Sequence, residues 1–238
     1  MDNIRKIAIF LALFTVLTAY SFGETLYSFS TGFYRFSEQY IEENYSRELD
    51  GVSLMIALNY FPEKFPLGWF IKTSIGGATG GFEWKDDTMD PLNLYSSSDI
   101  RLSVGPSIRL KMGSIIQVPI SIGPVFTNYR EENSYYHTYV YDYDDPHSYS
   151  SDSAFFEAFN LGALADVSIV INPFRRLTIV NGLTASYDFM RWERGYMQMN
   201  YRSLNSVNFK EQKFSALTIG FYIGIGVRFE ASKDQKKD

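Results

Sequence analysis

The sequence predicts an all-β fold, an eight-stranded antiparallel up-and-down transmembrane β-barrel with long extracellular loops and short periplasmic turns. The first observation is the segment 214–229, where apolar residues occupy every second position and glycine or polar residues lie between them. This is the period of a strand with two different faces. Second, earlier segments repeat the pattern, and short and long connections alternate between them. Third, aromatic residues make up 17% of the chain, yet no segment after residue 23 approaches the length of a spanning helix.

The first 23 residues form a predicted signal peptide. Arg5 and Lys6 give it a basic start, residues 7–17 form a short apolar core, and residues 21–23 precede the predicted cleavage site. A membrane-anchoring helix is the alternative, but the apolar run is shorter than the about 20 residues that such a helix needs. The predicted organisation is a signal peptide at 1–23, a barrel at 24–229 and a charged tail at 230–238, with both termini of the mature chain in the periplasm.

Charge and cysteine content exclude several classes of protein. The net charge of −5 argues against a nucleic-acid partner. The absence of cysteine excludes a disulfide framework and lipid attachment through an N-terminal cysteine. Closing a sheet on itself would hold the fold together instead.

Each of the first four predicted strands ends in a recognisable signal. A polar, acidic segment follows the first strand, and a compact turn with Pro62, Pro66 and Gly68 follows the second. A glycine-rich stretch and then a long polar segment follow the third strand, and a tight connection with Gly113 follows the fourth. These strands are predicted at 26–36, 52–61, 69–76 and 100–110.

The last four predicted strands contain two irregular positions. Pro119 and Pro124 lack ladder donors in the fifth strand, where we expect local irregularity. Asn181 falls in the apolar phase of the seventh strand, so a bulge or a rim position is expected there. The long connections run over 128–155 and 190–213. These strands are predicted at 116–126, 159–169, 177–189 and 214–229.

Aromatic residues gather near both ends of the predicted strands, where interfacial girdles would lie. A soluble calycin-type barrel is the alternative, but it would place the apolar face inside and does not account for the alternating connection lengths. The predicted girdles are Tyr27, Tyr60, Trp69, Phe174 and Phe229 on the short-turn side, and Phe33, Phe126, Phe155, Phe159, Tyr187 and Phe189 on the other.

Several charged residues fall on the inward phase of the strands. Because buried charges must be paired, we expect an internal ion-pair and hydrogen-bond network in an interior too narrow for an open channel. The alternative is a basic lumen for anionic solutes. The predicted inward charges are Lys72, Arg101, Arg109, Asp166, Asp188 and Arg228.

The longest predicted loop is rich in tyrosine, which offers rigid contact area with a polar tip. The predicted recognition residues are Tyr135, Tyr136, His137, Tyr139, Tyr141, Tyr143, His147 and Tyr149. Two alternatives use the same loop: a Ca²⁺ site at Asp142, Asp144, Asp145 and His147, and a catalytic group of His147 with Ser148, Ser150, Ser151 and Asp152. The spacing of the acidic residues does not match a specific Ca²⁺-binding pattern, and the spacing of the histidine and serines does not match a specific catalytic pattern. We therefore expect no catalytic residue, no metal and no cofactor.

The last strand resembles the C-terminal recognition strand of bacterial outer-membrane proteins through Phe221, Ile225, Val227 and Phe229. With the other features, it makes the chain resemble the small eight-stranded outer-membrane proteins of the OmpX and OmpW type. The resemblance implies a monomer in outer-membrane lipid, assembled by the barrel-assembly machinery. It also implies either binding of an extracellular protein through the loops, with a role in envelope integrity, or an OmpW-like conduit for small hydrophobic solutes. A lipid-modifying barrel enzyme is a third alternative, but the strand-borne histidine of a lipid deacylase is missing.

Overall fold

The computed structural model describes residues 23–40, 45–62, 65–80, 94–139, 148–174, 176–199, 202–204, 210–212 and 214–230. Within these ranges, no helix is long and apolar enough to cross a membrane. The strands are β1 (Gly23–Tyr40), β2 (Tyr45–Pro62), β3 (Leu67–Gly80), β4 (Leu94–Met112), β5 (Ile116–Tyr139), β6 (Ser148–Ile171), β7 (Leu177–Met199), β8 (Arg202–Leu204), β9 (Lys210–Gln212) and β10 (Phe214–Glu230).

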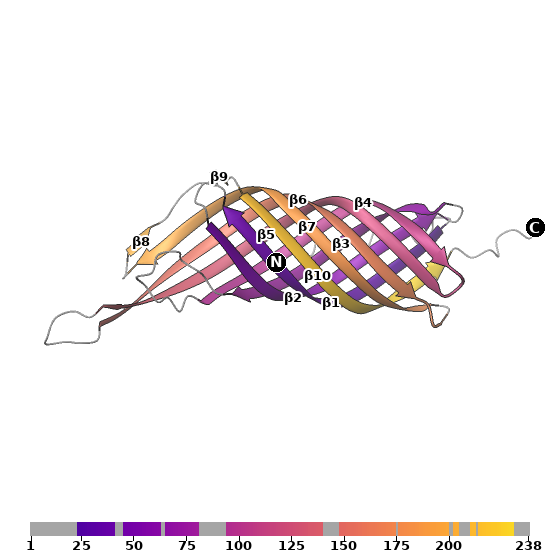
Figure 1. Cartoon of the computed structure of the whole chain (residues 1–238), viewed down its shortest axis with the longest axis horizontal. Helices are drawn as coiled ribbons and strands as arrows, with labels where there is room; N and C mark the ends of the chain where they lie inside the picture. Colours follow the sequence, from indigo (N-terminus) through magenta and orange to yellow (C-terminus); the bar gives the residue numbers. More distant parts are fainter. Residues whose placement is uncertain are drawn as a thin grey trace, which may run out of the picture.

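Eight of these strands form a closed antiparallel barrel. Each of β1 to β6 pairs with the strand that follows it, and β10 closes the sheet by pairing with both β7 and β1 (Figure 1). Tyr27, for example, is paired with Leu58 on one side and Val227 on the other. The two three-residue strands, β8 and β9, pair only with β7 among the described strands. The predicted eight-stranded antiparallel up-and-down barrel is confirmed.

The alternation of residue types separates an outer wall from the lumen. On β10, the side chains of Ile225 and Phe221 are 61% and 48% exposed, whereas those of Tyr222 and Thr218 are 4% and 3% exposed. All eight barrel strands carry exposed large apolar residues in the same way. So large a continuous apolar surface is unfavourable in water, and it fits the hydrocarbon of a bilayer. The soluble-barrel alternative is excluded, because the apolar face lies outside.

Aromatic residues mark both ends of this apolar surface. At the end with the short turns, the rings of Tyr27 and Phe229 and those of Tyr60 and Trp69 lie with centroids 5.7 Å apart in each pair, and Phe174 is exposed. Farther along the strands, five of the predicted aromatic residues face outward: Phe33, Phe126, Phe159, Tyr187 and Phe189. The side chain of Phe155 lies outside the described residues.

The three short turns lie at one end of the barrel, which we call the short-turn end. They fall at 63–66, 113–115 and 172–176, as predicted. Gly113 has a φ of +74°, a left-handed conformation that glycine adopts without steric cost. The opposite end is called the long-strand end.

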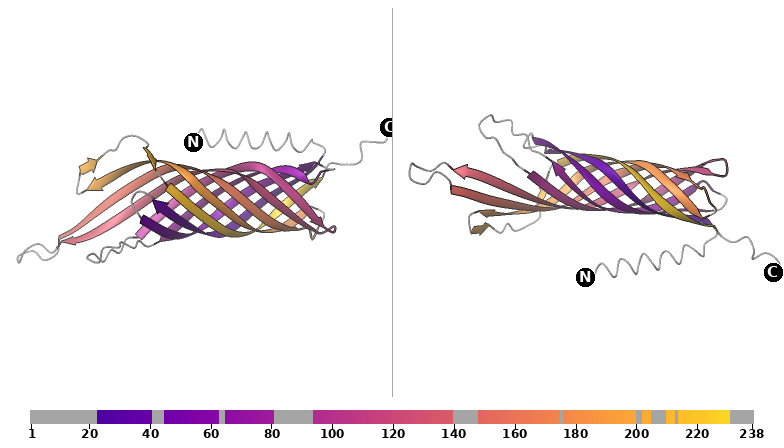
Figure 2. Two further views of the ribbon diagram at one scale, coloured as in Figure 1. Left: turned by 45° about the horizontal axis from the view of Figure 1, so that its top comes forward. Right: turned by 90° about the horizontal axis from the view of Figure 1, so that it is seen from below.

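At the long-strand end the predicted extent of the connections is wrong. β1 and β2 stay paired as far as Tyr40 and Tyr45, so only residues 41–44 join them. β5 and β6 stay paired to Tyr139 and Ser148, and both views in Figure 2 show this hairpin projecting beyond the barrel. A strand crosses a bilayer with about 9–11 residues, whereas β5 and β6 have 24 each. The apolar alternation marks only the lipid-facing part of each strand, because backbone pairing continues beyond it.

The expected irregularity at the prolines is present. The ladder between β4 and β5 is interrupted between the pairs Ser103–Val125 and Ser107–Ser121, where Pro124 and Pro106 lie. Of the two expectations for Asn181, the bulge is absent, because this residue is paired in regular register with Ile169 and Ile223. The position near the rim remains, since Asn181 is the fifth residue of β7 counted from the short-turn end.

The register of β7 shifts elsewhere instead. Leu161 is paired with Met190 and Gly162 with Asp188, which leaves Phe189 as the extra residue. A β-bulge reverses the inward and outward phase of the strand beyond it. Asp188 and Arg191 therefore both face the lumen, three positions apart, and both are about 1% exposed.

Candidate functional site

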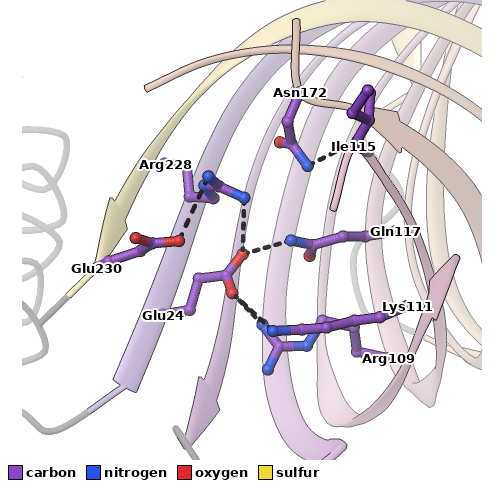
Figure 3. A network of polar contacts seen from close by, with 8 residues as sticks. All are labelled: Glu24, Arg109, Lys111, Ile115, Gln117, Asn172, Arg228 and Glu230. Carbon is purple, nitrogen blue, oxygen red and sulfur yellow. Dashed lines mark hydrogen bonds and ion pairs between the residues drawn. The ribbon is translucent and has the colours of Figure 1, made fainter. Parts of the chain in front are cut away.

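The lumen is crossed by three layers of charged side chains, and the first lies at the short-turn end (Figure 3). We call Glu24, Arg109, Gln117 and Arg228 the short-turn layer. The Glu24 carboxylate accepts a hydrogen bond from Arg109 Nη1 and another from Gln117 Nε2 at 2.7 Å. Lys111 Nζ lies 3.6 Å and Arg228 Nη1 4.0 Å from the same carboxylate. One acidic residue therefore joins strands β1, β4, β5 and β10.

Packing as well as charge holds this layer in place. The Arg109 guanidinium lies 4.6 Å from the centroid of the Phe61 ring, and Phe61 is 1% exposed. Arg228 also pairs with Glu230 at 3.3 Å, where the glutamate is half-exposed. The short-turn end of the lumen is thus filled by paired groups.

Glu24→Gln is expected to lower the free energy of unfolding by about 2 kcal/mol, since the buried Arg109 guanidinium would lose the charged acceptor of its hydrogen bond. The measurement is urea unfolding of the barrel in lipid vesicles, followed by tryptophan fluorescence. Glu230→Gln is the matched control, because Glu230 also pairs with Arg228 but is 52% exposed, and it is expected to cost less than about 1 kcal/mol. If both variants lower the free energy of unfolding by the same amount, Glu24 is not the residue that holds the short-turn layer together.

The middle layer consists of Lys72, Asp166 and Tyr222. Lys72 Nζ forms an ion pair with Asp166 and lies 4.1 Å from the centroid of the Tyr222 ring. The Tyr222 hydroxyl donates to the Asp166 carboxylate at 3.0 Å. The Tyr222 ring packs over Gly182, where an added methyl group would overlap it. These contacts join β3, β6, β7 and β10 across the lumen.

A third layer, the long-strand layer, has two parts, and the first surrounds Asp99. The Asp99 carboxylate accepts hydrogen bonds from Arg101 Nε and Nη2 at 3.1 and 3.2 Å and from the Tyr34 hydroxyl at 2.8 Å. The Arg101 guanidinium also lies 5.1 Å from the centroid of the Tyr34 ring. Such a two-point contact fixes the guanidinium in orientation as well as position.

The second part of the long-strand layer surrounds Arg191. Its Nε donates to Asn160 Oδ1 at 3.0 Å, and Asn160 Nδ2 donates to Asp188 Oδ2 at 3.0 Å. Arg191 also forms an ion pair with Glu38, whose side chain is 0% exposed. The ring of Tyr129 lies 5.2 Å from the Arg191 guanidinium. This chain of contacts joins β1, β5, β6 and β7.

The sequence predicts six inward-facing charged residues. In the structure each of the three layers contains two of them. Arg109 and Arg228 lie in the short-turn layer, Lys72 and Asp166 in the middle layer, and Arg101 and Asp188 in the long-strand layer. Sequence reasoning missed Glu24, Tyr34, Glu38, Asp99, Arg191 and Tyr222. Three of these, Glu24, Glu38 and Asp99, follow from extending the inward phase of a predicted strand by one or two residues. Tyr34 and Tyr222 already lie on the inward phase within predicted strands. Arg191 does not, because the bulge at Phe189 places it inside.

The predicted recognition residues lie in strands where the structure describes them. Tyr135, Tyr136, His137 and Tyr139 belong to β5, and Tyr149 belongs to β6. Tyr141, Tyr143 and His147 lie outside the described residues. Among the alternatives, Ser148, Ser150, Ser151 and Asp152 lie in β6, and Asp142, Asp144 and Asp145 are not described. In the part of the chain that is described, no three or more acidic or histidine side chains are grouped so as to hold a metal ion.

The residues of the predicted assembly signal all lie on the outer wall of β10. The side chains are 48%, 61%, 40% and 47% exposed for Phe221, Ile225, Val227 and Phe229. Their strand is the one that closes the barrel between β7 and β1.

One ion-pair cluster lies on the outer wall, beyond the last lipid-facing aromatic residue of β1. Arg35 Nε and Nη2 donate to the Asp50 carboxylate at 2.8 and 3.0 Å, and Glu48 lies 3.7 Å from Arg35. The hydrogen bonds from Arg35 lower the pKa of Asp50. The contribution of this pair is therefore present above the ordinary pKa of aspartate and is lost as the pH falls through the lowered pKa. Because both groups are exposed, this contribution to stability is small.

No protein-family model and no curated protein sequence matches the chain. Among solved structures, the chain is similar to Ail, the attachment invasion locus protein of Yersinia pestis, with 14% identity, 88% of this chain and 100% of that chain covered, and a TM-score of 0.38. It is also similar to Neisserial surface protein A, with 12% identity, 86% and 97% covered, and a TM-score of 0.39.

A third similar structure is a major outer membrane protein from Thermus thermophilus, with 15% identity, 84% of this chain and 99% of that chain covered, and a TM-score of 0.42. These identities and TM-scores transfer no residue role or activity to the present chain. The strand pairing and the apolar outer wall establish the fold by themselves. The chain is an eight-stranded antiparallel β-barrel of the outer-membrane type.

Proposed function

We propose that this barrel acts in the bacterial outer membrane as a closed scaffold that presents its long strands for binding an extracellular protein. The short-turn end, with both mature termini, faces the periplasm, and the long-strand end faces outward. This orientation is the usual one for barrels with short turns at one end and long segments at the other. Outer-membrane lipid and the barrel-assembly machinery are the remaining partners in this proposal.

The observation that carries the proposal is the filling of the lumen by three charged layers. Each described cation in these layers faces a carboxylate: Lys72 faces Asp166, Arg101 faces Asp99, Arg109 and Arg228 face Glu24, and Arg191 faces Glu38. Paired charges do not offer a basic surface to an anionic solute, and they interrupt any apolar passage. A barrel that is closed in this way acts through the surfaces outside its lumen.

An OmpW-like conduit for hydrophobic solutes is the competing function. It would need an apolar route through the wall or the lumen, whereas the inward residues of β4 include Asp99, Arg101, Ser103, Ser107 and Arg109. A role in envelope integrity requires no route and is compatible with the closed barrel.

Liposomes containing the purified full-length chain are expected to show no uptake of small anionic or hydrophobic solutes above protein-free liposomes. A swelling assay and single-channel conductance measure this. Robust flux of either solute class would overturn the closed-scaffold proposal in favour of a conduit.

Removal of residues 135–149 is expected to abolish adhesion of bacteria carrying the chain to a cultured cell layer and to leave the barrel folded. The paired segments of β5 and β6 inside the lipid-facing part remain intact in this variant. A matched variant keeps the length of the hairpin and replaces Tyr135, Tyr136 and Tyr139 with serine. Adhesion that persists in both variants would contradict recognition by this hairpin.

A further inference from the structure

An apolar groove of about 240 Å³ lies on the outer wall of the barrel, across β1, β2 and β3. The outward-facing residues that line it are Thr31, Val52, Leu54, Ile75 and Gly77. Its three large side chains are 53% to 61% exposed. The space above Gly77 is open. Apart from the two chain neighbours, a methyl group added there would have the Ser97 carbonyl oxygen, at 3.4 Å, as the only described atom within 4 Å. The groove can therefore hold a slender apolar group.

The groove follows the ladder between β2 and β3 and leads to a charged cluster. Toward the long-strand end, successive outward pairs of this ladder are Leu54–Ile75, Val52–Gly77 and Asp50–Thr79. The first two pairs line the groove, and the third places Asp50 at its end. Asp50 belongs to the ion-pair cluster of Arg35, Glu48 and Asp50 on the outer wall. A ligand along β2 and β3 would thus meet apolar side chains first and charged ones beyond them, which is the arrangement of a membrane lipid.

The charges of this cluster define the head group that it fits. The cluster carries one positive and two negative charges, and each of its side chains is more than half exposed. Asp50 occupies Arg35 Nε and Nη2. The Glu48 carboxylate lies 3.7 Å from Arg35 Nη1, too far for a hydrogen bond, and neither group has a hydrogen bond to another described residue. The cluster therefore offers a donor to an anion and a carboxylate to a cation, with one negative charge in excess.

We propose that the groove binds an acyl chain of one phosphatidylethanolamine molecule, whose ammonium group pairs with Glu48 and whose phosphate accepts a hydrogen bond from Arg35. The excess negative charge disfavours an anionic lipid such as phosphatidylglycerol. The quaternary ammonium of phosphatidylcholine has no N–H to donate to the carboxylate. This inference goes beyond the closed-scaffold proposal, because it concerns the outer wall and is independent of whether the lumen conducts.

Native mass spectrometry of the full chain, refolded in detergent, tests this proposal. The barrel is mixed with equal amounts of phosphatidylethanolamine, phosphatidylcholine and phosphatidylglycerol that carry identical acyl chains. The expected result is one retained phosphatidylethanolamine per barrel, in about threefold to fivefold excess over phosphatidylglycerol, as an exposed ion pair allows. Equal retention of the three lipids would overturn the proposal. A complex of two chains in place of the lipid complex would overturn it as well, because the groove would then belong to a second copy.

Gly77→Leu tests the groove, because the added side chain fills the open space and leaves the charged cluster unchanged. It is expected to reduce retention of all three lipids to the background level. Ala165→Leu is the matched control, since it makes the same kind of addition at an exposed position of β6, outside the groove. Its retention should equal that of the unchanged chain. Unchanged retention in a folded Gly77→Leu variant would overturn the proposal.

Glu48→Gln tests the head-group contact and decides the question even if Gly77→Leu does not fold, because Glu48 is 67% exposed. The substitution removes the excess negative charge, so the ratio of retained phosphatidylethanolamine to phosphatidylglycerol is expected to fall to about one. Glu230→Gln makes the same chemical change at the short-turn end, at a side chain that is 52% exposed, and should leave the ratio as it was. An unchanged ratio in Glu48→Gln would overturn the pairing of the ammonium group with this carboxylate.

Discussion

Asp166→Ala is expected to lower the free energy of unfolding by about 3–5 kcal/mol, which is the cost of removing one partner of a buried ion pair. The Lys72 ammonium is 7% exposed and would lose the carboxylate that balances its charge in the lumen. The Tyr222 hydroxyl would also lose the acceptor that lies 3.0 Å away. The measurement is urea unfolding of the barrel in phosphatidylcholine vesicles, with the electrophoretic shift of folded barrel as a second readout.

The double variant Lys72→Met with Asp166→Leu is the control for this prediction. It removes both charges and keeps apolar volume in the middle layer, and such replacements of a buried pair are often neutral. Its loss of stability is therefore expected to be well below that of Asp166→Ala. If the double variant loses as much as the single one, packing rather than charge pairing would explain the effect. Unchanged stability of Asp166→Ala would contradict a structural role for the middle layer.

Glu38→Gln is expected to lower the free energy of unfolding by about 3–4 kcal/mol, because Arg191 would lose the carboxylate with which it forms its buried ion pair. The side chains of Glu38 and Arg191 are 0% and 1% exposed, which makes this the most deeply buried ion pair in the described part of the chain. The same unfolding measurement applies. Because Arg191 also donates to Asn160, the variant is expected to keep the fold while it loses stability.

Glu48→Gln provides a matched control with the same chemical change. Glu48 also pairs with an arginine near the long-strand end, but its side chain is 67% exposed and that of Arg35 is 59% exposed. An ion pair that is exposed to solvent contributes little to stability, so the midpoint should hardly change. If the two glutamate variants lose equal stability, the long-strand layer would have no special role in closing the lumen.

The lipid-facing part of the barrel could be predicted from the sequence, because it depends on local alternation. In 214–229 each second side chain must meet hydrocarbon, and this requirement is visible in the order of residues alone. The short turns were predictable for the same reason, since residues such as Gly113 satisfy a local backbone requirement. The inward placement of Lys72 and Asp166 also follows from alternation. Their pairing does not, because it joins β3 and β6 across the lumen.

By itself, the sequence determined the eight barrel strands and the face that meets lipid, since both depend on side chains two positions apart. The up-and-down order followed from the alternation of short and long connections. Only the tertiary structure decided how far the strands extend beyond the lipid and which charges meet. Pairing of β5 with β6 continues through residues with no apolar alternation, because backbone hydrogen bonds hold it. The bulge at Phe189 turns Arg191 inward to meet Glu38, a contact between residues 153 positions apart. Bulges and contacts across a lumen depend on the closure of the whole barrel, which no local pattern specifies.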